Sequence, residues 1–237
     1  MTPVPGWPGP SSGPLPVKGA SIAPMADFSR TWAIVPLRGL EDAKTRLGAE
    51  LDAEERFDLV VAMASRTLGA ARDARGLRGT VLVTADPAAA RLATSFGART
   101  LVQRLPGLNA AIREARGFAI GAGATAILVL PIDLAAIDAG AIDSLLARAA
   151  AAGQGSPGTI VAAVPDRHGT GTNALLVAPP SAVEPAFGEG SLGAHRRAAT
   201  AAGAAFVELD GPLTADVDTG ADLIAAELAG RGGRGAA

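Results

Sequence analysis

The chain has 237 residues, of which 49% are hydrophobic and 19% are charged, a composition that excludes a disordered or highly charged protein. Lysine and arginine number 21 against 23 acidic residues, so the net charge of −2 provides no global basic field for nucleic acid. The absence of cysteine excludes disulfides, a thiolate nucleophile and cysteine-based metal sites.

The two ends of the chain differ in composition from its middle. Residues 1–28 are rich in proline and glycine, and we expect a disordered tail rather than a signal peptide because proline interrupts every apolar run. We expect one folded domain over residues 29–230 and a flexible C-terminus over residues 231–237. The longest apolar stretch, around residues 125–130, is too short to span a bilayer, which favours a cytoplasmic protein without membrane association.

Short apolar runs alternate with helix-like segments along the folded region. Unbroken runs of aliphatic residues are typical of strands buried on both faces. They predict strands at residues 32–36, 80–84, 98–102, 126–130, 159–164, 174–177 and 206–209. Helices are expected after residue 52 and near residues 87–96, 108–120, 139–151, 191–202 and 219–229. This order predicts an α/β fold, a single-domain, doubly wound, mostly parallel sheet with a small antiparallel addition.

The first expected helix carries its own start signal. Asp52 is a favourable N-cap residue, and Glu55 three residues later completes the pattern of a capping box. Apolar residues then recur at spacings of three and four and predict one buried face, made by Phe57, Val61, Ala64 and Leu68.

Ligands of doubly wound sheets bind beyond the carboxyl ends of the strands, so polar residues after strands are candidates for chemistry. The loop after the first strand carries Arg38, Lys44 and Arg46. Cations on a loop that leads into a helix suit a triphosphate, and Lys44 stands out because arginine fills nearly every other cationic position. The alternative is a solvated surface loop, and the spacing is not that of a Walker motif.

Three carboxylates form the candidate metal site. Asp133 follows a very apolar strand, and Asp216 and Asp218 point to one side of an extended segment. Two carboxylates on one face repel unless a cation lies between them, and Mg²⁺ prefers carboxylate oxygens together with phosphates. The competing interpretations are a turn or cap role for Asp133 and capping of the last helix by Asp218.

Two glycine-rich segments offer backbone amides to an anion. The segment DRHGTGTN leads to Thr172 at the start of a strand, and FGEGS, with Gly188 and Ser191, opens a helix. Either segment alone is better explained as an ordinary turn with a cap. His195, one turn into that helix, is either a packing residue or a phosphate contact. Asn109, near the start of another helix, is either a cap or a contact to a base or ribose.

Six segments, in this order, carry a family resemblance: VPLRGLEDAKTRL, GLNAAI, LPIDL, DRHGTGTNALLV, FGEGSLGAHRRAA and ADVDTGADL. Over residues 32–229 the chain resembles the 2-phospholactate/phosphoenolpyruvate guanylyltransferases of coenzyme F420 biosynthesis. GTGTNALL followed by FG-x-x-S-x-x-x-H is more specific to that family than KTRL or DVDT. The resemblance implies a nucleotidyltransferase fold and transfer of GMP from GTP to the phosphate of a three-carbon phospho-acid, with release of diphosphate.

The resemblance also implies roles for the candidate residues. Lys44, Arg46 and Asp133 would be catalytic, and Asp133 with Asp216 and Asp218 would hold Mg²⁺. The substrates would contact Arg38, Asn109, Thr172, Gly188 and Ser191. The partners would then be small molecules, with neither nucleic acid nor membrane involved, and a homodimer is compatible with the sequence.

Two other functions stay open at this point. One is a nucleotidyltransferase that acts on another phosphorylated acceptor, such as a molybdopterin or a sugar phosphate. The other is a non-catalytic nucleotide-binding module. Retention of all the candidate carboxylates and cations argues against the second.

Overall fold

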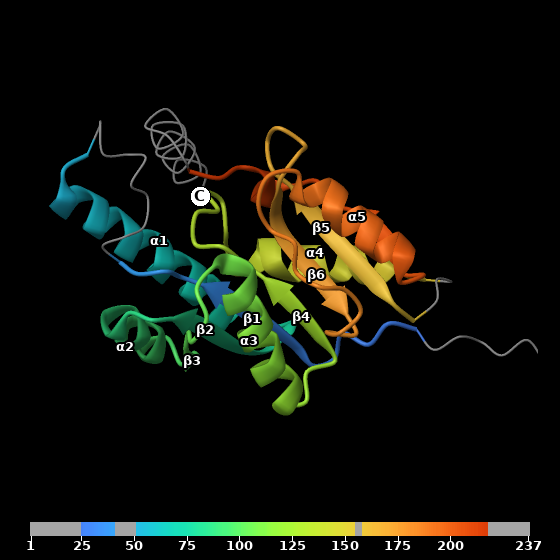
Figure 1. Ribbon diagram of the computed structural model, residues 1–237, viewed down its shortest axis with the longest axis horizontal. Helices are drawn as coiled ribbons and strands as arrows, with labels where there is room; N and C mark the ends of the chain where they lie inside the picture. The colour runs from blue at the N-terminus through green and yellow to red at the C-terminus, as the bar shows by residue number, and fades with distance from the viewer. Residues whose placement is uncertain (1–24, 41–50, 155–157, 218–237) are drawn as a thin grey trace, which may run out of the picture.

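Parallel strands joined by helices form the framework of the protein, seen in a computed structural model that describes residues 25–40, 51–154 and 158–217 (Figure 1). The strands are β1 (Thr31–Pro36), β2 (Leu77–Thr84), β3 (Arg99–Val102), β4 (Ala126–Val129), β5 (Ile160–Pro165), β6 (Thr172–Ala178) and β7 (Ala205–Glu208). The helices are α1 (Ala53–Asp73), α2 (Pro87–Ser95), α3 (Leu108–Gly121), α4 (Ala139–Ala152), α5 (Ser191–Ala201) and the short 3₁₀ helix η2 (Pro212–Thr214).

The described strands form one sheet in the order β3-β2-β1-β4-β6-β5-β7. β6 is antiparallel to β4 and β5, and the other neighbouring pairs are parallel. The predicted fold class, a mostly parallel sheet with a small antiparallel addition, is confirmed. The helix expected at residues 219–229 lies outside the described residues.

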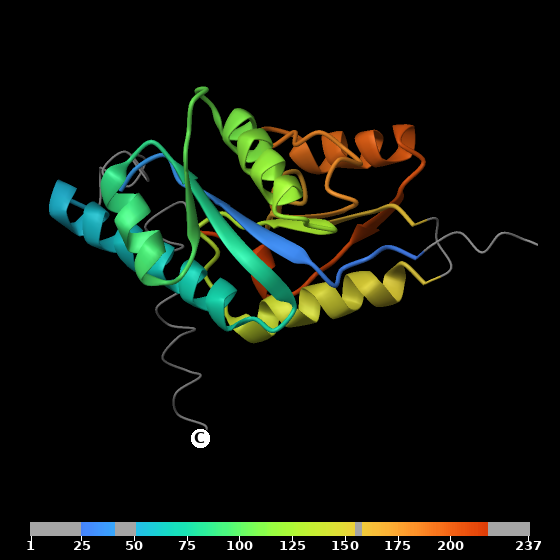
Figure 2. The ribbon, with the colours of Figure 1, turned by 90° about the horizontal axis from the view of Figure 1, so that it is seen from below.

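Helices cover both faces of this sheet. Figure 2 shows α3 and α5 on one side of the sheet and α1 and α4 on the other; α2 packs with α1 on the latter side. In β1, Ala33 and Val35 face the α1 side while Ile34 faces the α3 side, and all three are fully buried. Burial on both faces explains the unbroken apolar runs of the central strands.

The edge strand β3 differs from this pattern. Arg99, Thr100 and Val102 are exposed, and Val102 keeps 69% of its surface accessible. The prediction that every apolar run is buried on both faces is therefore wrong for β3. A strand at the edge of a sheet has one neighbour only, and its burial depends on what covers the edge.

Helix α1 begins as predicted. Asp52 accepts hydrogen bonds from the backbone N–H of Glu54 and Glu55 at 2.9 Å, and Glu55 accepts one from the backbone N–H of Asp52 at 2.9 Å. The buried face is shifted around the helix from the predicted one. Val60 and Met63 are buried beside the expected Ala64 and Leu68, whereas Phe57 and Val61 pack at its margin.

The described chain contacts the core from residue 26 on. Ala26 and Phe28 pack against the core, and Thr31 donates hydrogen bonds to the Phe28 carbonyl through both its backbone N–H and its hydroxyl. These contacts lie just before residue 29, where we expected the folded domain to begin. Residues 1–24 and 231–237 lie outside the described residues. Among those described, no helix is both long and apolar enough to cross a membrane.

Candidate functional site

The carboxylate segment lies beyond the carboxyl end of β4. Leu134 and Asp216 form an isolated antiparallel bridge. The backbone N–H of Val217 donates to the carbonyl of Asp133 at 2.9 Å, and that of Ala135 donates to the carbonyl of Ala215 at 3.0 Å. The bridge makes Asp133 and Asp216 neighbours although they are far apart in the chain. We call residues 133–135 and 215–217 the carboxylate ribbon.

Helix α1 fixes the first half of the carboxylate ribbon. Arg66 donates from Nη1 to the carbonyl of Ala135 at 2.8 Å, and the hydroxyl of the buried Thr67 lies 3.4 Å from the carbonyl of Ile132. Neither residue was a sequence candidate. Both belong to a helix whose sequence pattern reflects its apolar face, and no nearby residue in the sequence indicates that they bind remote carbonyls.

Strand β6 fixes the second half. Asn173 is buried, and its Nδ2 donates to the carbonyls of Leu213 at 3.1 Å and Thr214 at 3.0 Å. These carbonyls precede Asp216 by two and three residues. Asn173 therefore sets where the chain enters the carboxylate ribbon. The segment DRHGTGTN stands out in the sequence for its glycines, which do not predict this role.

The donor set of the carboxylate ribbon fits Mg²⁺ in its chemistry. Two carboxylates, both partly exposed, come from neighbouring backbone positions at the ligand-binding edge of the sheet. Mg²⁺ is commonly held by one or two carboxylates and completes its octahedron with water and substrate phosphates. Within the described ranges no cluster of three or more acidic, histidine or cysteine residues forms a complete metal cage. Asp218, the third expected ligand, lies outside them.

A pocket of about 240 Å³ opens between the end of β1 and the start of α3. It is lined by Pro36, Leu37, Arg38, Gln103, Gly107, Leu108 and Ala111. The predicted Arg38 is thus a pocket residue, whereas Lys44 and Arg46 lie outside the described residues. The pocket combines apolar walls with one cation and one side-chain amide, a lining that is typical of a small-molecule site.

Gln103 is a pocket residue that sequence reasoning missed. Its Nε2 donates to the carbonyls of Leu105 at 2.6 Å and Gly107 at 3.2 Å, which shapes the loop from β3 to α3. The missed signal was available, because Gln103 is the first polar residue after β3 and the same rule singled out Arg38 after β1.

The Arg38 loop is held by the neighbouring strand and helix. The carboxylate of Asp86 accepts hydrogen bonds from the N–H of Leu40 at 2.9 Å and of Ala88 at 2.7 Å, and so caps α2 while fixing the loop. Burial of this carboxyl opposes its ionisation, but these hydrogen bonds outweigh it and hold the pKa of Asp86 below its usual value.

The start of β6 and the start of α5 meet in a second cluster. Thr172 Oγ1 lies 3.0 Å from His195 Nδ1, and the backbone N–H of Ala186 donates to His195 Nε2 at 3.1 Å. The backbone N–H of Ser191 donates to the carbonyl of Gly188 at 3.1 Å. The structure therefore brings together Thr172, Gly188 and Ser191, three of the residues expected to contact the substrates, with the Ser191 N–H used by the Gly188 carbonyl. It shows His195 as a buried packing residue.

Glycine is required just before α5. Gly190, the N-cap residue, has φ of 66°, in the left-handed region that side chains disfavour, and Gly188 has φ of 131°. The N–H of Leu192 donates to the carbonyl of Thr170 at 3.1 Å, so the first turn of α5 is tied to the β5–β6 turn. The sequence FGEGS thus forms a turn that places the start of the helix beside Thr172.

Helix α3 holds the chain that leads to Gly188. Asn109 accepts a hydrogen bond at Oδ1 from the N–H of Phe187 at 2.8 Å and donates from Nδ2 to its carbonyl at 2.9 Å. The N-cap residue of the helix is Gly107, so of the two interpretations of Asn109 the cap is excluded. Both polar atoms of the amide are bonded to backbone, which gives Asn109 a positioning role beside the pocket.

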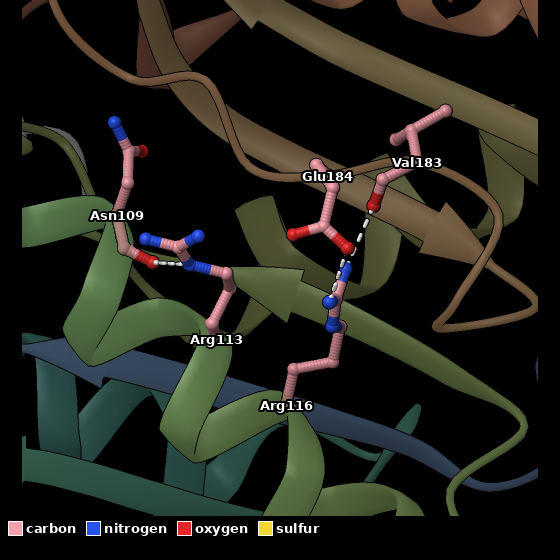
Figure 3. Close-up of polar contacts among 5 residues, drawn as sticks. All are labelled: Asn109, Arg113, Arg116, Val183 and Glu184. Carbon is pink, nitrogen blue, oxygen red and sulfur yellow. Dashed lines mark hydrogen bonds and ion pairs between the residues drawn. The ribbon is translucent and has the colours of Figure 1, made fainter.

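A second contact from α3 holds the same chain farther back. Arg116 donates to the carbonyl of Val183 at 2.9 Å and to the carboxylate of Glu184 at 2.6 Å (Figure 3). Arg113, one turn before it, donates to the backbone carbonyl of Asn109 at 3.3 Å. We call residues 183–188 the acceptor loop, since they lead from these anchors to Gly188.

Comparison with known proteins identifies the family. Residues 31–236 match the family described as "Guanylyl transferase CofC like". The chain belongs to this family. It is 40% identical over 207 residues to a phosphoenolpyruvate guanylyltransferase of Sphaerobacter thermophilus, covering 87% of this chain and 96% of that protein. A phosphoenolpyruvate guanylyltransferase of Rubrobacter xylanophilus is 41% identical over 200 residues, covering 84% of this chain and 94% of the relative.

The fold is shared more widely than the sequence. A solved nucleotidyl transferase from Methanothermobacter thermautotroptrophicus superposes with a TM-score of 0.57 at 18% identity, over 83% of this chain and 95% of that one. That likeness concerns the fold alone. The family match and the curated relatives identify the CofC-like chain as a nucleotidyltransferase, as its sequence segments predicted.

Proposed function

We propose that this CofC-like chain transfers GMP from GTP to the phosphate of phosphoenolpyruvate and releases diphosphate, as a step of coenzyme F420 biosynthesis. The observation that carries the proposal is about 40% identity to phosphoenolpyruvate guanylyltransferases over nearly their whole length. Their names favour phosphoenolpyruvate over 2-phospholactate, and they disfavour a molybdopterin or sugar phosphate as acceptor.

The chemistry needs positioning more than proton transfer. An oxygen of the acceptor phosphate attacks the α-phosphorus of GTP, and the bond from that phosphorus to the oxygen bridging to the β-phosphate breaks as diphosphate leaves. The acceptor phosphate is already an anion, so no general base is required. The obstacle is the repulsion between two anions, which fixed positive charge and aligned amides reduce.

The geometry supports a division of the site between the two substrates. The pocket beside Arg38 and Gln103 suits the nucleoside part of GTP. The cluster of Thr172, Gly188 and Ser191 suits the acceptor phosphate through its side-chain hydroxyls and the turn at Gly188, since the Ser191 N–H already donates to the Gly188 carbonyl. The carboxylate ribbon lies at the same edge of the sheet.

We propose that Asp133 and Asp216 hold Mg²⁺. When bound, the ion would neutralise charge on the triphosphate and the leaving diphosphate. The backbone bridge of the carboxylate ribbon supports this role because it brings the backbones of two acidic residues that are remote in the sequence to one place at this edge of the sheet.

We assign the remaining cations to the triphosphate. Arg38 lines the pocket, and Lys44 follows it on the same loop of the sequence. Lys44→Ala is expected to raise the KM for GTP or to lower kcat, and unchanged kinetics would remove Lys44 from the site.

One reaction panel tests the proposed function. Purified full-length chain is incubated with GTP and Mg²⁺ together with phosphoenolpyruvate, 2-phospholactate or glucose 1-phosphate, and product masses and released diphosphate are measured. We expect a guanylylated three-carbon product and stoichiometric diphosphate with phosphoenolpyruvate. Nucleotide binding by thermal shift without turnover on any acceptor would instead support a non-catalytic module.

A further inference from the structure

His195 is a buried titratable residue to which the proposed reaction assigns no task. Its side chain is fully buried, and both ring nitrogens have partners from other elements. The ring also contacts Phe187 edge to face, with the ring centres 5.1 Å apart. A histidine placed in this way is a connecting point between β6, α5 and the acceptor loop.

The backbone partner decides which ring nitrogen carries the proton. The N–H of Ala186 can only donate, so His195 Nε2 is the acceptor and bears no hydrogen. The neutral ring then carries its hydrogen on Nδ1. That hydrogen points to Thr172 Oγ1, 3.0 Å away, and the Thr172 hydroxyl accepts it.

The direction of this bond determines what the Thr172 hydroxyl does. Its oxygen accepts from His195, so its own hydrogen is available for another acceptor. In the part of the chain that the structure describes, the hydroxyl has no partner besides His195. Thr172 opens β6 opposite Pro165 at the end of β5, which is the ligand-binding edge of the sheet.

Burial keeps the ring in this state. It lowers the pKa of His195 to about 4, so the ring remains neutral at physiological pH and one nitrogen stays an acceptor. A protonated ring could not accept from Ala186, whose N–H would then face a donor.

We propose that His195 is a positioning residue that turns the Thr172 hydroxyl into a hydrogen-bond donor for the acceptor phosphate. This inference rests on the proposed function, because it takes Thr172 as part of the acceptor site. The same ring sets the position of Ala186, two residues before Gly188. His195 thereby aligns the Thr172 hydroxyl and the chain leading to Gly188 without touching the substrate itself.

Two substitutions separate the two ring nitrogens. In His195→Gln, the amide oxygen reaches roughly the place of Nε2 and still accepts from Ala186, but the donor to Thr172 is lost. In His195→Asn, the shorter amide reaches roughly the place of Nδ1 and still donates to Thr172. We expect Gln to raise the KM for phosphoenolpyruvate about ten-fold, the effect of one hydrogen bond, and Asn to raise it clearly less.

The remaining kinetic measurements exclude a general structural effect. The KM for GTP should stay within about two-fold in both variants, because one lost hydrogen bond at the acceptor does not reach the nucleotide pocket. In a Thr172→Val background, His195→Gln should add little, since the hydroxyl it orients is gone. His168→Gln, at the exposed second histidine of the chain, is the matched control and should leave both KM values unchanged.

Nitrogen NMR of the histidine rings tests the tautomer without any turnover. We expect one ring, absent from spectra of His195→Gln, with a protonated Nδ1 and a bare Nε2 that persists down to about pH 5. An Nε2–H ring overturns the proposal whatever the enzyme does. So do equal effects of Gln and Asn, parallel rises in both KM values, or full additivity with Thr172→Val. A correct tautomer in a protein that transfers no GMP would place the failure in the proposed function.

Discussion

The two halves of the sheet bury different kinds of polar groups. In the half formed by β1 to β4 and their helices, the buried polar residues of the described chain are all threonines: Thr31, Thr67, Thr80 and Thr84. In the half formed by β5 to β7 and α5, they are Thr172, Asn173, Ser191 and His195. The first half is apolar with a few hydroxyls, whereas the second half carries an imidazole and an amide.

These groups also differ in what they connect. Thr31 bonds to a carbonyl three residues away, whereas the hydroxyls of Thr67 and Thr84 reach carbonyls 65 and 46 residues away. Asn173 reaches carbonyls 40 and 41 residues away, and His195 joins a strand, a helix and the acceptor loop. In the half formed by β1 to β4, where we propose that GTP binds, hydroxyls such as that of Thr67 reach one remote carbonyl. In the half formed by β5 to β7 and α5, which we call the acceptor half because we propose the acceptor phosphate there, Asn173 and His195 each join two partners. Substitutions should therefore distinguish residues that take part in the reaction, which change kcat, from residues that position the site, which change KM or stability.

The largest expected effect tests the carboxylate ribbon. Asp133→Asn keeps the size of the side chain and the backbone bridge but removes a charge, and we expect kcat to fall by about 10³-fold, as for loss of a main electrostatic stabiliser. Diphosphate release with GTP, phosphoenolpyruvate and Mg²⁺ measures it, beside circular dichroism for the fold.

Asp138→Asn is the matched control for Asp133→Asn. Asp138 caps α4 through the N–H of Ala141 at 2.7 Å and lies five residues from Asp133. Its replacement should cost at most about 1 kcal/mol of stability and leave kcat unchanged. Substantial turnover by Asp133→Asn would refute the role of this carboxylate.

The next effect concerns the stability of the acceptor half at low pH. The pKa of His195 is lowered by burial from 6.5 to about 4, so the unfolded chain takes up a proton at a higher pH than the folded one. Stability therefore falls as the pH falls from 6.5 toward 4, and the shift corresponds to about 3 kcal/mol.

Urea unfolding at pH 7, 6, 5 and 4 measures this contribution. Carboxylates titrate at the acid end in every variant, so the informative quantity is the difference between the wild type and His195→Gln. The wild type should lose more unfolding free energy than the variant across this window. Parallel pH profiles would mean that the folded protein already accommodates a charged ring.

A smaller effect is expected where the two halves meet. Asn109→Ala removes both hydrogen bonds to Phe187, and we expect the KM for phosphoenolpyruvate to rise about ten-fold while the KM for GTP changes less. Steady-state kinetics with each substrate varied in turn measures both. Arg113→Ala is the control, because it leaves the Asn109 amide in place. A larger rise in the KM for GTP would return Asn109 to the base or ribose contact that the sequence suggested.

The sequence predicts the apolar half of the molecule better than the polar half. Runs such as that of β4, all four residues of which are buried, locate the strands because burial on both faces leaves an unbroken apolar signal. The rule that ligands bind beyond the carboxyl ends of the strands singles out Asp133 in the sequence, whereas the bridge that brings the Asp216 backbone beside it has no sequence signal. The exposure of β3 could not be predicted from its own residues, because it depends on the absence of a neighbouring strand beyond it.

The polar contacts of the acceptor half have no local pattern. Asn109 and Phe187 are 78 residues apart, and neither residue type specifies the other. The sequence left a cap and a contact to a base or ribose open for Asn109, and neither interpretation includes its bonds to the Phe187 backbone. Sequence motifs can mark such residues as candidates, but only the fold shows that their partners are backbone groups.

The smallest expected effect asks whether charge holds the acceptor loop. The ion pair of Arg116 and Glu184 joins a largely covered guanidinium to a carboxylate that is 66% exposed, and solvent screens such a pair. Glu184→Gln should therefore lower the unfolding free energy by less than about 1 kcal/mol and leave the KM for phosphoenolpyruvate unchanged. Arg116 would still donate to the carbonyl of Val183, and Asn109 would still hold Phe187. A KM increase that disappears at high salt would show instead that charge, rather than directional contacts to the backbone, positions this loop.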